Sequence, residues 1–84
     1  MEYDKIEKIF EEVESDLNNV GDNAFEGLKI ISKYTKNPVQ GADHDILYSE
    51  DIEKLIEAGI TEEDVIKLSK LNWMINDEYL VCFV

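Results

Sequence analysis

His44, Asp45 and Cys82 are the residues of this sequence whose types could do chemistry. His44-Asp45 is the only His-Asp pair in the chain, an arrangement that two-metal phosphohydrolases use. Such a site needs further histidines and another aspartate. The chain has one histidine, so a multi-histidine metal site is excluded. We expect His44 to make a structural hydrogen bond near the junction of a loop and a strand.

Cys82 is the only thiol of the chain. A cysteine becomes a nucleophile when a neighbouring base and a positive environment lower its pKa. Cys82 lies in an apolar segment of an acidic chain, and both conditions raise the pKa of a thiol. The sequence therefore predicts an inert core cysteine. A single cysteine also excludes the internal disulfides of a small secreted scaffold.

Carboxylates are too numerous for any one pair to indicate an active site. A glycosidase-type pair needs a cleft that pushes two carboxyl pKa values apart, and an 84-residue domain with one core rarely forms such a cleft. The stretch Asp43-His44-Asp45 lacks the glycine and the terminal glutamate of a calcium-binding loop. The sequence thus predicts a protein that is not an enzyme and that holds no cofactor or metal ion.

Net charge is the feature that distinguishes this chain. Twenty acidic residues oppose eight lysines, there is no arginine, and the formal net charge is −12. Such a chain repels nucleic acid and anionic membranes and attracts proteins that have basic grooves. Solubility of a small domain needs a charge magnitude of only about 2–8. The excess costs folding stability through self-repulsion, which favours a functional role for it.

The acidic residues of the first 14 positions follow a helical spacing. Asp4, Glu7, Glu11 and Glu14, here called the acidic row, recur at three- and four-residue steps, which place neighbouring side chains about 5–6 Å apart. The row is comparable to a strand of phosphates on a rigid support. The alternative is that these acidic faces are only solvated. The predicted partner-binding residues are Asp4, Glu7, Glu11, Glu14, Glu50, Glu53, Glu57, Glu62 and Glu63.

Two helices are predicted in the first half of a single domain that covers residues 1–84. Apolar residues at helical steps predict an amphipathic helix over residues 3–20, ended by Asn18, Asn19 and Gly21. A second helix is expected over residues 24–34, capped by Asp22 or Asn23. It is apolar on more than one side, which predicts a central position.

The second predicted helix carries the only clustered positive charges, which are Lys29, Lys33 and Lys36. Three lysines on one face could hold a phosphate group. They could also neutralise part of the acidic row or lie on a solvated face, and we favour these last two interpretations.

The second half of the chain predicts short strands and a helical hairpin. His44–Tyr48 alternates as a strand, and Ser49 is expected to cap a third helix with Glu50 and Asp51 in its first turn. Gly59 is expected to end that helix in a left-handed conformation, with Ile60 folding back. Thr61-Glu62-Glu63-Asp64 fits the capping box of a fourth helix, whose predicted buried positions are Val65, Ile66, Leu68 and Leu71.

Two strands are predicted to close the chain. Trp73–Ile75 and Tyr79–Val84 form a hairpin around a turn at residues 76–78, and the last strand is apolar on both faces. The predicted fold class is α+β in the order ααβααββ, with a small, mainly antiparallel sheet of about three strands packed by helices. The helical hairpin is comparable to a helix-turn-helix, but Glu62, Glu63 and Asp64 at the start of its second helix would repel DNA.

No basic region followed by an apolar run begins the chain, and the longest apolar run, residues 79–84, is far too short to span a bilayer. We therefore expect the protein in the cytoplasm, which is the host cytoplasm if a phage encodes it.

Several stretches carry a resemblance to known proteins. Ala42–Tyr48, Glu57–Val65 and Leu71–Trp73 resemble small proteins encoded by phages and other mobile elements. In size, acidity and lack of catalytic residues, the whole chain is similar to anti-CRISPR and anti-restriction inhibitors. The resemblance implies an inhibitor that occupies a nucleic-acid-binding groove of a defence complex. It assigns no role to an individual residue.

The expected function is that of a non-enzymatic phage or mobile-element inhibitor. Its partner would be a basic nucleic-acid-binding protein of the host, in a CRISPR-Cas or similar system, bound through an acidic surface that mimics nucleic acid. Direct binding to nucleic acid or membranes is not expected. The alternative is a general protein–protein or homodimerisation module that uses the apolar C-terminal hairpin, with residues 79–84 at the dimer interface.

Overall fold

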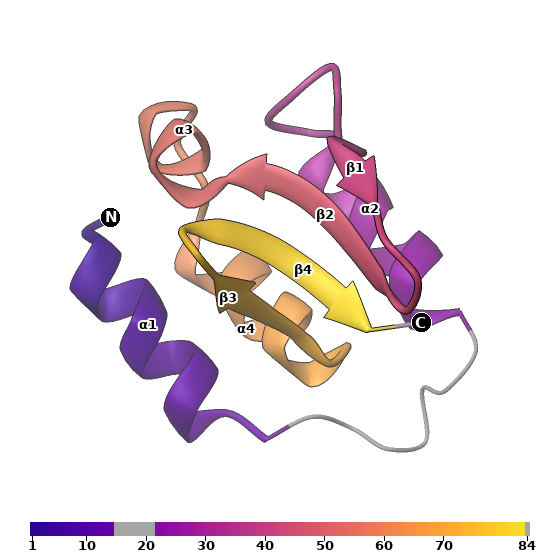
Figure 1. The fold of residues 1–84 in the computed structure, drawn as a ribbon. Helices are drawn as coiled ribbons and strands as arrows, with labels where there is room; N and C mark the ends of the chain where they lie inside the picture. The colour runs from indigo at the N-terminus through magenta and orange to yellow at the C-terminus, as the bar shows by residue number, and fades with distance from the viewer. Residues whose placement is uncertain (15–21, 84) are drawn as a thin grey trace.

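A computed structural model describes residues 1–14 and 22–83 of the chain. Within them, four helices accompany a four-stranded antiparallel sheet of strand order β1-β2-β4-β3 (Figure 1). Helices α2 and α4 lie behind the sheet in that view, and α1 runs beside β3. The predicted α+β class and element order are confirmed, with four strands in place of about three. The bounds are α1 Tyr3–Glu12, α2 Asn23–Ile31, β1 Gly41–Ala42, β2 Ile46–Asp51, α3 Ile52–Glu57, α4 Glu62–Lys70, β3 Trp73–Asn76 and β4 Tyr79–Phe83.

Helix α1 is shorter than its apolar pattern predicts. Val13 has extended backbone angles, with φ −88° and ψ 112°, so the prediction of a continuous helix through residue 20 is wrong at this point. A tertiary contact accounts for the end of the helix, because the Val13 carbonyl accepts a hydrogen bond of 2.7 Å from the Ser69 hydroxyl. The predicted helix end at Asn18, Asn19 and Gly21 lies outside the described residues.

Helix α2 packs one side on the core and is not central. Its Phe25 side chain is 62% exposed, whereas Ile31 is fully buried. The helix ends at Ile31 and not at Tyr34, because the Lys33 and Tyr34 amides donate to carbonyls three residues earlier and form tight turns. Asp22 occupies the predicted cap position without a side-chain cap bond. The Asn23 amide instead reaches across the core to the Leu71 carbonyl, at 2.9 Å.

The segment that contains β1, β2 and the start of α3 differs most from what the sequence predicts. Strand β1 was not predicted, and β2 begins at Ile46, which leaves His44 in the preceding turn. Ser49 and Glu50 continue β2 and do not start a helix. The buried Ser49 hydroxyl donates to the Pro38 carbonyl, and Asp51 caps α3 by accepting a 2.8 Å bond from the Glu53 amide. A serine with a partner in a distant loop is not free to cap a helix.

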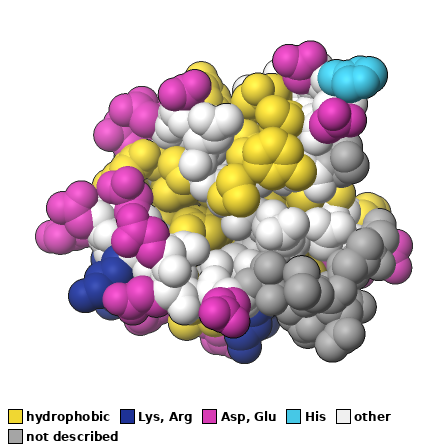
Figure 2. Space-filling view, turned by 60° about the horizontal axis from the view of Figure 1, so that its bottom comes forward, with side chains coloured by type: hydrophobic (Ala, Val, Ile, Leu, Met, Phe, Trp, Pro, Cys, Tyr) yellow, Lys and Arg dark blue, Asp and Glu magenta, His cyan; other side chains and the backbone are white. Residues whose placement is uncertain are grey.

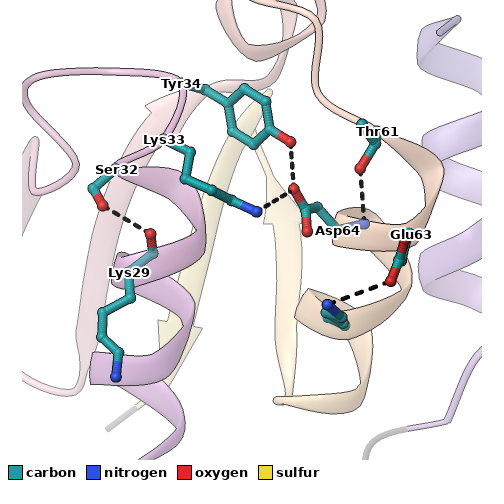
Figure 3. Close-up of polar contacts among 8 residues, drawn as sticks. Lys29, Ser32, Lys33, Tyr34, Thr61, Glu63 and Asp64 are labelled. Carbon is teal, nitrogen blue, oxygen red and sulfur yellow. Dashed lines mark hydrogen bonds and ion pairs between the residues drawn. The ribbon is translucent and has the colours of Figure 1, made fainter.

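The helical hairpin of α3 and α4 is confirmed. Gly59 has φ 90°, and the Ile60 amide folds back to donate to the Leu55 carbonyl at 3.0 Å. The Thr61 hydroxyl accepts a 3.2 Å bond from the Asp64 amide, which caps α4. Only this half of the predicted capping box forms. The Asp64 carboxylate does not return to the start of α4 but points to residues that follow α2 (Figure 3).

Asp64 is a buried carboxylate that links α4 to the end of α2. The Tyr34 hydroxyl donates to its Oδ2 atom, and the Lys33 ammonium lies 2.8 Å from the same atom (Figure 3). Burial alone would raise the pKa of Asp64. The hydrogen bonds from Lys33 and Tyr34, with the charges of Lys33 and Lys67, outweigh burial and hold the pKa below its usual value of 3.8.

We predict that Asp64→Asn lowers the free energy of unfolding at neutral pH by about 1–2 kcal/mol, because the charge-assisted bonds are weakened. A lowered folded pKa stabilises the fold above the ordinary aspartate value of 3.8, and that contribution is lost as pH falls through the folded pKa. The wild type and the variant should therefore converge in acid, as measured by urea denaturation. Glu63→Gln, which alters an exposed neighbour, should change stability little. A constant gap between wild type and Asp64→Asn at every pH would contradict this assignment.

The two faces of the sheet have different environments. Leu47, Trp73 and Cys82 pair across β2, β4 and β3 on the face that joins the helical core. Tyr48, Val81 and Met74 form the corresponding row on the opposite face, outside that core. The β3–β4 turn has φ of 50° at Asp77 and 72° at Glu78, as the preferred hairpin turns require. The last strand is thus apolar on both faces, as predicted, but only one face packs against the helical core.

Candidate functional site

The acidic row lies on the surface of α1 and just beyond it. Asp4, Glu7 and Glu11 are exposed on the helix, and Glu14 is exposed two residues after its end. The ion pairs within the described residues involve Glu26, Glu62, Glu63 and Asp64, so none involves the row. Lys5 of α1 points to the other side of the helix, where it pairs with Glu62 of α4 at 3.4 Å. Within the described residues, no lysine is therefore paired with the row.

Most of the acidic row faces the edge of the sheet. Glu7 and Glu11 line a groove of about 220 Å³ between α1 and β3, together with Met74. Glu11 and Glu14 line an adjoining groove of about 370 Å³, which also includes Met74. Three carboxylates of the row thus border a strand of the sheet, a placement that helical periodicity alone did not reveal.

Further carboxylates gather around Tyr3 at one end of α1. Burial raises the pKa of the Tyr3 hydroxyl, and the negative charges of Glu7, Glu78, Asp51 and Glu53 raise it further. These charges come from α1, the β3–β4 turn, the end of β2 and the start of α3. The sequence predicted Glu7 and Glu53 as site residues but missed Asp51 and Glu78, because only the pairing of β2 with β4 brings them here.

The remaining predicted partner-binding residues differ in their exposure and in their ion pairs. Glu53 and Glu57 are exposed on α3. Glu62 and Glu63 are exposed on α4, but each forms an ion pair with a lysine, Lys5 at 3.4 Å and Lys67 at 3.5 Å.

Glu50 does not lie on the surface. Its side chain is buried, and its carboxylate accepts hydrogen bonds from the Thr35 hydroxyl at 2.9 Å and the Asp51 amide at 3.0 Å. The placement of Glu50 among surface contact residues is therefore corrected.

The lysine cluster does not reach the acidic row. Lys29 pairs with Glu26 at 3.3 Å and lies 5.0 Å from the centre of the Phe25 ring. Lys33 pairs with Asp64, and Lys36 is exposed. The three side chains lie on a solvated face, and the suggestion that they neutralise part of the acidic row is wrong.

An apolar surface lies on one side of the sheet, and the sequence predicted only its C-terminal hairpin part. It consists of Ile46, Tyr48, Met74, Tyr79, Val81 and Phe83, here called the open face. Phe83 is 44% exposed, Tyr79 40% and Met74 38%. Figure 2 shows hydrophobic side chains over this side of the molecule, with Asp and Glu side chains at their edges. Large exposed apolar patches with a polar border are typical of interaction sites.

His44 and Cys82, the two residues with potential for chemistry, do not belong to the open face. His44 is exposed in the β1–β2 turn, where its backbone amide donates to the Asp43 carboxylate at 2.8 Å. Cys82 is fully buried, and burial raises the pKa of its thiol. In residues 1–14 and 22–83, no group of three or more His, Cys, Asp or Glu side chains could hold a metal ion.

We predict that Cys82 reacts with a small alkylating reagent at least about a hundred-fold more slowly in the folded protein than in denaturant, because reaction requires unfolding of a core strand. Mass spectrometry of samples quenched over time measures both rates. Equal rates would contradict the burial of the thiol.

None of the helices in the described part of the chain combines the length and apolar composition needed to cross a bilayer. Comparisons with protein-family models, with curated proteins and with solved structures find no match to this chain. A function must therefore be inferred from its own residues and their geometry.

Proposed function

We propose that this protein is a non-enzymatic inhibitor of phage or mobile-element origin that binds a host defence protein. The acidic row and the carboxylates around Tyr3 would occupy a basic groove that normally holds nucleic acid. The partner class is a CRISPR-Cas or similar complex in the host cytoplasm. The protein itself would bind neither nucleic acid nor membranes, because both are polyanions.

One observation carries the proposal: the acidic row is exposed on α1 and just beyond it, and within the described residues it forms no ion pair with a lysine. Glu26, Glu62 and Glu63, by contrast, each form an ion pair with a lysine. Unpaired carboxylates at about 5–6 Å spacing on a helix are free to meet Lys and Arg side chains of a partner.

Capture from a lysate of bacteria that carry CRISPR-Cas and restriction systems tests the proposal. The tagged protein is the bait, and the lysate is treated with nuclease so that nucleic acid cannot bridge bait and prey. We expect nucleic-acid-binding defence proteins to be captured at low salt and released at high salt, because ions screen exposed charges beyond about 10 Å at 0.1 M. Capture that is independent of salt, or of proteins without basic surfaces only, would count against it.

A further inference from the structure

We infer that the open face is the apolar centre of the same interface, and that its occupant is a partner segment carrying apolar side chains between Lys or Arg residues. The inference rests on the proposed function for the basic character of the partner. Beyond the proposed function, the inference names a second surface of this chain that contacts the partner, and it names the kind of partner segment that fits this surface.

The open face has a centre and a perimeter. Val81 pairs with Tyr48 on one side and Met74 on the other, and it has no exposed surface although it lies outside the helical core. The larger side chains Tyr79 and Phe83 surround the same row and remain 40% and 44% exposed. Aromatic residues and methionine are enriched at protein interfaces. The neighbouring side chains therefore already form a packed apolar surface without a partner.

Every charged residue in the strands and turns of the sheet is acidic. Residues 41–51 and 73–83 contain six carboxylates and no lysine, because all eight lysines lie on helices or in the α2–β1 connection. The acidic border is defined as Glu7, Glu11, Asp51, Asp77 and Glu78, together with Asp43 and Asp45 of the β1–β2 turn that leads into Ile46. A partner that covers the open face must place its own border against these charges, and Lys and Arg are the side chains that match them.

A second copy of this chain fits the open face poorly. Two copies related by a two-fold axis would bury the same patch on each other. This arrangement would bring each acidic border close to the other, and like charges across an interface cost several kcal/mol. The net charge of −12 on each copy adds to the repulsion. Charge complementarity therefore favours a basic partner over the homodimer that the sequence left as an alternative.

A cavity at the end of the open face, between β1 and the β3–β4 turn, supplies a place for a long basic side chain. It has a volume of about 440 Å³ and is lined by Tyr48, Asn76, Asp77 and Tyr79, with Gln40 and Gly41. Two aromatic rings can pack against the aliphatic stem of a lysine or arginine, and the Asp77 carboxylate can accept from its charged end. The cavity thus joins the apolar and acidic parts of the surface.

Two short synthetic peptides of equal positive charge test the inference with the full chain. One alternates lysine with leucine, and the other has serine in place of each leucine. We expect the leucine peptide to bind about ten-fold more tightly at low salt and to shift the amide resonances of Met74, Val81 and Phe83. Phe83→Ser should weaken its binding about ten-fold. Phe25→Ser, which removes an exposed phenylalanine of α2, should leave binding unchanged.

The outcomes separate the two proposals. Equal affinity for both peptides, or no effect of Phe83→Ser in a folded variant, would overturn the inference. The proposed function would then survive if reversing charges of the acidic row still weakened both peptides. Failure of the leucine peptide to bind at low salt would also overturn the inference. A dimer in sedimentation that Phe83→Ser dissociates would overturn it by assigning the open face to a second copy.

Discussion

Replacing Gly27 by alanine is expected to destabilise the fold by about 3 kcal/mol or more. A Cβ atom at this position would lie 1.9 Å from Nε1 and 2.3 Å from Cε2 of Trp73. The indole cannot move aside easily, because it is 2% exposed and its Nε1 donates to the Asn23 carbonyl at 3.1 Å. Overpacking of a core typically costs about 1–3 kcal/mol and sometimes more. Small domains are stable by only about 5–15 kcal/mol, so the loss is a large fraction of the total.

The midpoint of urea denaturation measures the effect of Gly27→Ala. Gly41→Ala is the matched control, because no heavy atom lies within 4 Å of a Cβ built there, and we expect a change of less than about 0.5 kcal/mol. Adding Trp73→Leu to Gly27→Ala should restore part of the stability that the alanine alone removes, relative to additivity. If both glycine variants kept the wild-type midpoint, α2 would not pack against Trp73 this closely.

Reversing the charge of the whole acidic row is expected to abolish capture of the defence protein while the fold stays intact. The variant carries Asp4→Lys, Glu7→Lys, Glu11→Lys and Glu14→Lys. All four side chains are exposed, and none is in an ion pair within the described residues, so the variant breaks no such pair. The association rate constant should fall at least about ten-fold, because steering by the acidic surface turns into repulsion.

A second variant separates position from net charge. Reversing Glu2, Glu12, Asp22 and Glu26 to lysine alters the same number of exposed carboxylates outside the row. Each reversal changes the charge by two units, so both variants have a formal net charge of −4 in place of −12. Surface plasmon resonance with the captured partner at low salt compares their association rates. Equal loss in both variants would mean that net charge, and not the acidic row, determines binding.

Local sequence signals predicted the local structure. Gly59 and Thr61 end one helix and begin the next through contacts within a few residues, so the helical hairpin could be read directly from the chain. The end of α1 and the extension of β2 could not, because they depend on Ser69 reaching Val13 and Ser49 reaching Pro38. Hydrogen bonds between distant residues overrode the helical pattern at Val13 and the capping preference of Ser49.

For the candidate site too, the sequence predicted what depends on local spacing and not what depends on contacts between distant residues. Helical spacing placed Asp4, Glu7 and Glu11 on one exposed surface, because neighbours on a helix are fixed by periodicity. It could not show that Glu50 is buried and accepts a hydrogen bond from Thr35, since these residues are 15 positions apart. The sequence predicted an apolar C-terminal hairpin, but it did not indicate which face of the hairpin is exposed. The alternation of Tyr79–Phe83 is apolar on both sides, and only the placement of the helices shows which side is uncovered.

Competition between this protein and nucleic acid for the captured defence protein tests the central claim most directly. A labelled nucleic acid that the partner binds is titrated with the unlabelled protein at low salt, and its release is followed by fluorescence anisotropy. The account predicts that the protein displaces the nucleic acid completely, and that the acidic-row variant does not. A stable complex that contains the partner, the nucleic acid and this protein together would contradict it.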